Sequence, residues 1–283
     1  MKWRNQRQSG NIEDLRGGGG MGPAMIGGGG IGTLIIGLVI YFLTGNSSVI
    51  TQPQTAPPAQ VGAPQAGTGA AQDDTSKQFV SSVLASTEDV WGEIFRKRGK
   101  VYRQPKLVLF SGRVQSACGI AGSATGPFYC PNDQKVYLDT SFFQQMRNQL
   151  GAPGDFAAAY VIAHEIGHHV QNQLGTMDKV QSLQQRANKR QANALSVKLE
   201  LQADFYAGVW AHYAQQKGLL EQGDVEEALN AASAVGDDRL QRENQGYVVP
   251  DSFTHGTSKE RAYWFNRGLQ SGDITQGDTA QGP

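Results

Sequence analysis

The sequence predicts an α+β fold, mainly α, that follows a single apolar N-terminal segment. Apolar residues recur at helical spacing through most of the C-terminal two thirds of the chain, and two short runs rich in Val, Leu, Tyr and Phe have strand character. The third observation is a stretch from residue 17 to 72 without Asp, Glu, Lys, Arg or His. At 283 residues the chain can hold one or two domains, but its N-terminal quarter has too few large apolar residues for a soluble core.

Charge and cysteine content exclude several classes of function. The 25 Lys and Arg residues balance the 25 Asp and Glu residues, so no broad basic face is expected and we expect no nucleic-acid partner. Two cysteines are too few for a disulfide framework or for a zinc site built from cysteine.

The apolar segment runs from Met25 to Leu43, and its nineteen residues can just cross a hydrocarbon core of about 30 Å as a helix. A cleaved signal peptide would need small residues after the apolar core, and Tyr41–Gly45 is a poor cleavage site. A phosphate-binding loop would need a following Lys and Ser or Thr, which are absent. We therefore expect a transmembrane signal anchor. Basic residues before it predict a cytoplasmic N-terminus for residues 1–24, with the remaining chain periplasmic in a Gram-negative cell.

Composition divides the chain that follows. Residues 44–74 are rich in Pro, Gln, Ala and Gly and predict an extended linker, residues 75–270 a folded domain, and residues 271–283 a disordered tail. Within the domain we expect strands at 106–110 and 135–139, and helices near 75–99, 155–174, 179–216, 224–235 and 257–269. The region 179–216 reads as two helices or one bent helix.

The helix near 155–174 carries an H-E-x-x-H pattern at His164, Glu165 and His168. Residues four apart lie on one helical face, so the two imidazoles can bind one Zn²⁺ ion, with Glu165 beside a metal-activated water. The alternative is a surface helix with two stray histidines. It is disfavoured because the surrounding residues are apolar, and unpaired polar groups are costly there.

A catalytic zinc site needs a third protein ligand. The continuation typical of metzincins is absent, because Gln171 and Leu174 occupy its Gly and His positions. Downstream, Glu200 and Asp204 lie four residues apart. We expect Glu200 to bind the metal and Asp204 to accept a hydrogen bond from the second N–H of a ligating histidine, although the reverse assignment is open.

Of the remaining histidines, His255 is the candidate for catalysis. It lies in a loop before a predicted helix, where it could donate to the oxyanion formed on the substrate, with Asp251 or another carboxylate orienting its ring. The alternative is a loop histidine that bonds the local backbone. We expect His169 and His212 to be structural, because their directions on the helices do not suit the same site.

Cys118 and Cys130 lie in a loop rich in Gly, Ser and Ala between the two predicted strands. In an oxidising compartment they can form a disulfide worth about 2–3 kcal/mol. The alternative is a pair of buried free thiols.

Several motifs together resemble the bacterial membrane-anchored predicted neutral zinc metallopeptidases, which are gluzincin-like. They are the glycine-rich apolar segment, Gly126–Pro131 with Val136–Asp139, His164–His168, Glu200–Asp204 and Thr254–Thr257. The resemblance implies a zincin-like domain and a peptidase with one catalytic Zn²⁺ ion held by His164, His168 and Glu200. It also implies Glu165 as general base, and a substrate peptide pairing with the strand at Val136–Asp139.

Neither the residues nor the resemblance identifies the substrate or the oligomeric state. A zinc-binding periplasmic scaffold without turnover is the main alternative, and Glu165 argues against it because a structural site needs no base. Hydrolysis of a non-peptide amide, such as a peptidoglycan cross-link, is also open.

Overall fold

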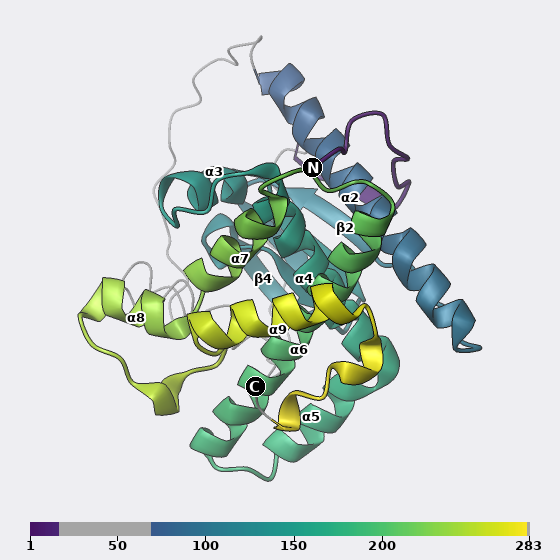
Figure 1. Cartoon of the computed structure of the whole chain (residues 1–283). Coiled ribbons are helices and arrows are strands. Elements are labelled where there is room, and N and C mark those ends of the chain that lie inside the picture. Colours follow the sequence, from purple (N-terminus) through teal and green to yellow (C-terminus); the bar gives the residue numbers. More distant parts are fainter. Residues whose placement is uncertain (17–68, 282–283) are drawn as a thin grey trace.

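The computed structural model describes residues 1–16 and 69–281 (Figure 1). The predicted anchor at 25–43 and most of the predicted linker at 44–74 lie outside the described residues. Among the helices within the described ranges, none combines the length and the apolar character needed to cross a bilayer.

The described chain is mainly helical, which confirms the α+β class. Its α-helices are α2 (Gly69–Lys97), α3 (Ser141–Asn148), α4 (Asp155–Leu174), α5 (Thr176–Gln184), α6 (Lys189–Gln216), α7 (Asp224–Ala234), α8 (Asp237–Gln245) and α9 (Ser258–Ser271). Its strands are β1 (Ile12–Asp14), β2 (Lys106–Phe110), β3 (Arg113–Ser116), β4 (Gly119–Gly122), β5 (Phe128–Cys130) and β6 (Lys135–Asp139). The predicted region 179–216 is two helices, and the capping box expected at Thr257 is present at the start of α9.

One four-stranded sheet has the order β1-β2-β6-β5. Strands β1, β2 and β6 are parallel, whereas β5 runs antiparallel to β6. Strand β2 pairs with β6 along its whole length, and β5 occupies its other side at Lys135–Tyr137. The prediction that the strand at Val136–Asp139 pairs with a substrate is therefore wrong for Val136 and Tyr137, because a peptide can add only to a free edge. Among the described strands, β5 forms that edge of the sheet.

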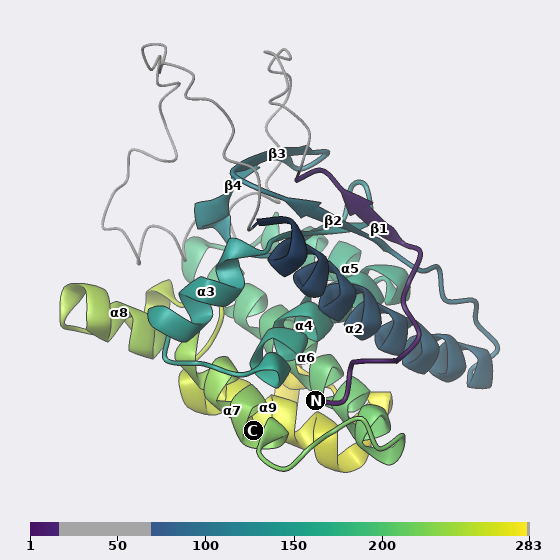
Figure 2. The same ribbon diagram turned by 90° about the horizontal axis from the view of Figure 1, so that it is seen from above.

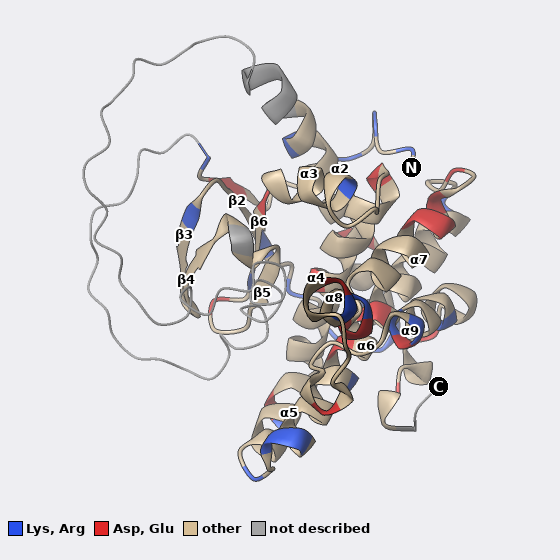
Figure 3. Ribbon diagram, turned by 90° about the vertical axis from the view of Figure 1, so that its left-hand side faces the viewer, with Lys and Arg blue, Asp and Glu red and all other residues tan. Residues whose placement is uncertain are grey.

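The two faces of the sheet pack against different partners (Figure 2). Leu107, Leu109 and Leu138 belong to the large core shared with the helices, whereas Val108 and Tyr137 belong to a smaller core with the β3–β4 hairpin. This alternation is the period-two pattern of strands buried on both faces. Figure 3 shows the resulting arrangement, with the sheet and hairpin on one side and α4, α6 and α9 on the other.

Residues 1–16, here called the N-terminal strap, are part of this fold rather than a separate segment. Trp3 is buried in the large core, β1 pairs with β2, and Arg7 forms an ion pair with the buried Glu88 of α2 at 3.0 Å. The amino group of Met1 lies 2.5 Å from Asp155, the first residue of α4. The sequence prediction that the folded domain begins near residue 75 is therefore wrong, because the strap supplies both a strand and core side chains.

The C-terminal tail is also ordered up to residue 281, so the prediction of disorder after residue 270 is wrong for the described part. Two 3₁₀ turns follow α9: η5 (Ile274–Gln276) lies against α9, and η6 (Thr279–Gln281) lies against α6. Thr279 is buried, and its hydroxyl donates a 2.8 Å hydrogen bond to the carbonyl of Lys198. The polar composition of the tail hid these contacts, which are made to backbone groups of a distant helix.

Candidate metal centre

Helix α4 carries the H-E-x-x-H pattern, and its side chains from Phe156 to Gln171 are all buried. Its first turn is held by Glu227 of α7, whose carboxylate accepts a 3.0 Å hydrogen bond from the backbone N–H of Phe156. Its end is set by Gly175, whose φ of 77° lies in the left-handed region that favours glycine. A helix buried in this way can position polar side chains rigidly, provided that each has a partner.

Helix α6 approaches α4 closely at Gly167, inside the motif. A Cβ atom placed on Gly167 would lie 2.9 Å from the backbone carbonyl oxygen of Ala203. Because Ala203 lies between Glu200 and Asp204, this close crossing sets both carboxylates against the two motif histidines.

The ligand atoms offered by His164, His168 and Glu200 all lie within 4.8 Å of one another, and the three residues are buried. The Nε2 atom of His164 is 3.1 Å from one carboxylate oxygen of Glu200, and the Nε2 atom of His168 is 3.4 Å from the other. Two imidazoles and one carboxylate that converge on one point form the three-ligand set of catalytic zinc sites, which leaves a further position open. This group can therefore hold a zinc ion.

Charge supports the same assignment. Burial would lower the pKa of His164, but the carboxylates of Asp204 and Glu200 outweigh it and raise the pKa to about 10. Zinc binds an imidazole only in its neutral form, so the proton of His164 must leave when a metal binds. With His164 neutral, the ionised carboxylates of Glu165, Glu200 and Asp204 exceed the buried guanidinium of Arg261 by two negative charges, which is the charge that one divalent cation neutralises.

Asp204 lies on the other side of His164 from Glu200. Its Oδ1 is 2.8 Å from Nδ1 of His164 and accepts a 2.5 Å hydrogen bond from the hydroxyl of Tyr160. Arg261 of α9 donates to both of its oxygens, at 2.8 and 3.0 Å. The polar contacts of the Asp204 carboxylate are thus made to Nδ1 of His164, to Tyr160 and to Arg261. Asp204 therefore orients the ring of His164, and the geometry favours Glu200 over Asp204 as the metal ligand.

Glu165 follows His164 on the same helix and is 8 % exposed, so it is buried like the candidate ligands. Burial raises the pKa of its carboxyl above the ordinary value for Glu. A raised pKa makes a carboxylate a stronger proton acceptor, as general-base chemistry near neutral pH requires.

His255 is buried near the same centre, and of the two predicted sources for its orienting carboxylate, Asp251 or another residue, Asp251 is wrong and another carboxylate takes the position. Asp251 is exposed and forms an ion pair with Arg190 at 3.0 Å. The ring of His255 instead contacts Asp237 of α8, with Nδ1 3.2 Å from Oδ1, and the other oxygen of Asp237 accepts three backbone N–H groups of the His255 loop. Burial would lower the pKa of His255, but Asp237 and the charge of Glu200 raise it above the ordinary value.

His169 and His212 lie apart from the candidate ligands, as expected. The ring nitrogens of His169 contact the Tyr129 hydroxyl at 3.0 Å and the carbonyl of Arg103 at 2.6 Å. Nδ1 of His212 donates to the carbonyl of Leu269 at 2.7 Å. Both histidines serve the packing of their helices.

Sequence reasoning missed four members of the centre: Tyr160, Gln171, Asp237 and Arg261. Tyr160 had a usable signal, because it precedes His164 by four residues and so shares its helical face. Arg261 and Asp237 had none, since they reach the site from α9 and α8 by tertiary packing alone.

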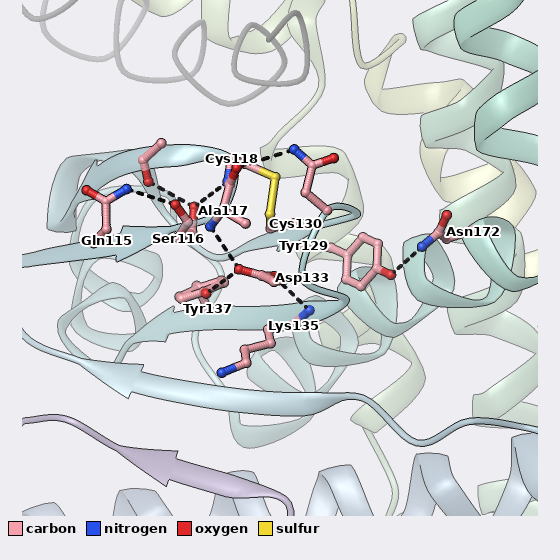
Figure 4. Close-up of a disulfide and its surroundings, with 12 residues drawn as sticks. Gln115, Ser116, Ala117, Cys118, Tyr129, Cys130, Asp133, Lys135, Tyr137 and Asn172 are labelled. Carbon is pink, nitrogen blue, oxygen red and sulfur yellow. Dashed lines mark hydrogen bonds between the residues drawn. A yellow bond between two sulfur atoms is a disulfide. The ribbon is translucent and has the colours of Figure 1, made fainter. Parts of the chain in front are cut away.

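Cys118 and Cys130 are joined by a disulfide with a Cα–Cα distance of 5.8 Å, in line with the predicted pairing (Figure 4). The bridge ties the β3–β4 turn to the end of β5. At the other side of β5, the Tyr129 hydroxyl accepts a 2.8 Å hydrogen bond from Asn172 of α4 (Figure 4). Strand β5 is thus fixed between the disulfide and helix α4, which carries the H-E-x-x-H pattern.

Comparison with known proteins agrees with this geometry. The family described as "Putative neutral zinc metallopeptidase" matches residues 1–280. The chain belongs to this family. It is 51% identical to the uncharacterized protein YpfJ of Escherichia coli K12 over 284 residues, covering 99% of this chain and 98% of that protein. It is 41% identical to the uncharacterized protein Rv2575 of Mycobacterium tuberculosis H37Rv over 215 residues, 72% of each chain. No solved structure matches the chain. The matched range includes the N-terminal strap, whose structural role is described above.

Proposed function

We propose that the protein is a zinc-dependent metallopeptidase that hydrolyses peptide bonds, with His164, His168 and Glu200 as metal ligands. The observation that carries this proposal is the buried Glu165, which adjoins a three-ligand group and binds no partner side chain among the described residues. A closed structural zinc site would use a fourth protein ligand and would need no such carboxylate.

The reaction divides among the side chains as follows. A zinc ion held by the three ligands would supply Lewis acidity, which acidifies a water and polarises the scissile carbonyl. Glu165 takes the proton from the attacking water and passes it to the leaving nitrogen. His255, protonated and oriented by Asp237, donates a hydrogen bond to the oxyanion that develops from the scissile carbonyl oxygen. Arg261 acts indirectly, by holding Asp204 ionised against His164.

The proposed substrate is an extended peptide that pairs with the edge of β5. Strand β5 takes this role instead of β6, because it forms the edge of the described sheet beside α4. An added strand would run next to the helix that carries Glu165 and would gain backbone hydrogen bonds without regard to sequence. This mode of binding suits unfolded or flexible protein segments.

The experiment that tests the function compares wild type with Glu165→Gln. The amide cannot accept the proton of water, so cleavage of an unfolded protein or peptide library should fall by about 10²–10⁴-fold while zinc content and melting temperature stay unchanged. The control is His168→Ala, which should lose the zinc itself. If wild type cleaves nothing in such a library or in envelope extracts, and Glu165→Gln complements a deletion strain fully, the protein is a zinc-binding scaffold instead.

We also propose that the catalytic domain works outside the cytoplasm and is attached to the membrane by residues 25–43. The Cys118–Cys130 disulfide supports export, because thiols in the bacterial cytosol are kept reduced.

The docked N-terminal strap restricts how the chain can cross the membrane. Residues 1–16 pair with the domain's own sheet, so a single span with a cytoplasmic N-terminus requires the strap to leave the domain.

Labelling with a membrane-impermeant maleimide can test both points in intact cells whose outer membrane has been opened. Gln6→Cys and Lys179→Cys place single reactive thiols at exposed positions of the strap and of the domain. Labelling of Lys179→Cys supports export. Labelling of Gln6→Cys as well means that the strap is docked outside the cytoplasm, whereas protection of Gln6→Cys alone supports the single span with an undocked strap.

A further inference from the structure

Gln171 lies inside the metal centre without being one of its ligands. It is fully buried on α4, three residues after His168. Its side-chain oxygen is 2.9 Å from Nδ1 of His168, and its amide nitrogen donates to the carbonyl of Leu199 at 2.7 Å and to the side-chain oxygen of Gln202 at 3.2 Å. Both groups of this buried amide are therefore used.

These contacts determine which way the Gln171 amide faces. The carbonyl of Leu199 can only accept, so the NH₂ group of Gln171 must face it. The Oε1 atom, which can only accept, then faces His168, and Nδ1 of His168 must carry the proton. A neutral His168 with its proton on Nδ1 has its lone pair on Nε2, the atom that lies 3.4 Å from Glu200.

We propose that Gln171 is a positioning residue for metal binding, which fixes the tautomer and ring orientation of His168. The proposal rests on the zinc site proposed above and deepens it. Each candidate histidine ligand then has its own orienting partner: Asp204 holds Nδ1 of His164 and Gln171 holds Nδ1 of His168. Gln171 also links the two ligand-bearing helices, since Leu199 directly precedes Glu200 on α6.

The neutral amide suits this position. Glu165, Glu200 and Asp204 already crowd three buried carboxylates around the site, against the guanidinium of Arg261. A fourth carboxylate at position 171 would orient His168 but would leave a negative charge that a divalent cation does not neutralise. An amide orients the ring without adding charge.

The test measures zinc affinity of the full-length protein by competition with a chelator. Gln171→Met keeps the length and burial of the side chain but removes both hydrogen-bonding groups, and it should weaken zinc binding by about 10–100-fold. The matched control is Gln173→Met on the same helix, since Gln173 bonds Arg103 and His169 and touches no ligand. It should bind zinc as tightly as wild type.

Nitrogen NMR of the zinc-free protein, labelled at its five histidines, gives the second measurement. In wild type the spectrum of His168 should show the proton on Nδ1, and in Gln171→Met this tautomer should no longer be fixed. The proposal is overturned if wild type carries the proton on Nε2, a result that needs no variant to fold. It is equally overturned if Gln171→Met binds zinc like wild type. Neither measurement uses peptidase activity, so a protein that cleaves nothing still gives a clear answer.

Discussion

The helical half and the sheet half of the molecule are held together in different ways. The helical half contains α4, α6 and α9 (Figure 3). There α6 crosses α4 at Gly167 and α9 at Gly208 and Gly268, and the helices enclose buried charges. In the sheet half, a disulfide and the docked strap join segments that have little core of their own. Under the function proposed above this difference has a reason, because ligand atoms must be placed to a fraction of an ångström, whereas a strand edge that pairs with a peptide needs only to be kept in place.

The strongest expected effect lies in the buried charges of the helical half. Arg261→Met would remove the guanidinium that donates to both oxygens of Asp204, which has no exposed surface, and breaking such a buried pair costs about 3–5 kcal/mol. Arg267→Met, on the same helix, removes a half-buried guanidinium that donates hydrogen bonds to Gln276 and Tyr263 but has no ion pair among the described residues, and it should cost about 1 kcal/mol. Urea unfolding of both variants gives the comparison. Equal losses would mean that the charge network does not hold this half.

The junction of the two halves should respond to acid through His169. Burial lowers the pKa of His169 to about 4, against 6.5 in an unfolded chain. Between these values the unfolded state binds a proton that the folded state excludes, so stability is intact above pH 6.5 and falls as the pH drops toward 4, by up to about 3 kcal/mol. His169→Gln, which cannot titrate, should lack this part of the loss in unfolding curves recorded with a chelator present. An unchanged pH dependence would contradict the assignment.

In the sheet half, the disulfide should affect stability without affecting metal. Its two cysteines are 12 residues apart, and a loop of this size gives about 2–3 kcal/mol of stabilisation in the chain-entropy treatment. Cys118→Ser with Cys130→Ser should lower the free energy of unfolding by that amount and leave zinc affinity as in wild type. A large loss of zinc in this double variant would show that the two halves are coupled more tightly than their contacts indicate.

The smallest expected effects on stability come from replacing two helical glycines by alanine. Gly167→Ala brings a methyl group against the backbone of α6 and should cost about 1–3 kcal/mol, with a parallel loss of zinc affinity. Gly92→Ala in α2 meets no atom within 4 Å, so removing the flexibility of glycine should stabilise the fold by about 0.5–1 kcal/mol. Opposite signs in thermal unfolding support the difference between the halves, and a destabilised Gly92→Ala would oppose it.

The sequence by itself determined the features that depend on local periodicity. The spacing of His164 and His168 places both rings on one face of any helix, and the apolar pattern around them required that helix to be buried. Strands β2 and β6 and the start of α9 were likewise readable, because alternation and the capping box at Thr257 are local signals.

Tertiary structure decided what depends on contacts between distant segments. The strap was invisible because Ile12–Asp14 is short and polar, and it becomes a strand only by sharing backbone hydrogen bonds with β2. The interior position of β6 and the partnership of Asp237 with His255 were equally hidden. The contact of Arg261 with Asp204 was hidden as well, and so were the contacts of Gln171 with His168 and Leu199. The physical reason is the same in each case: a buried polar group needs a partner, and the chain's path in space, rather than its local pattern, determines which partner is near.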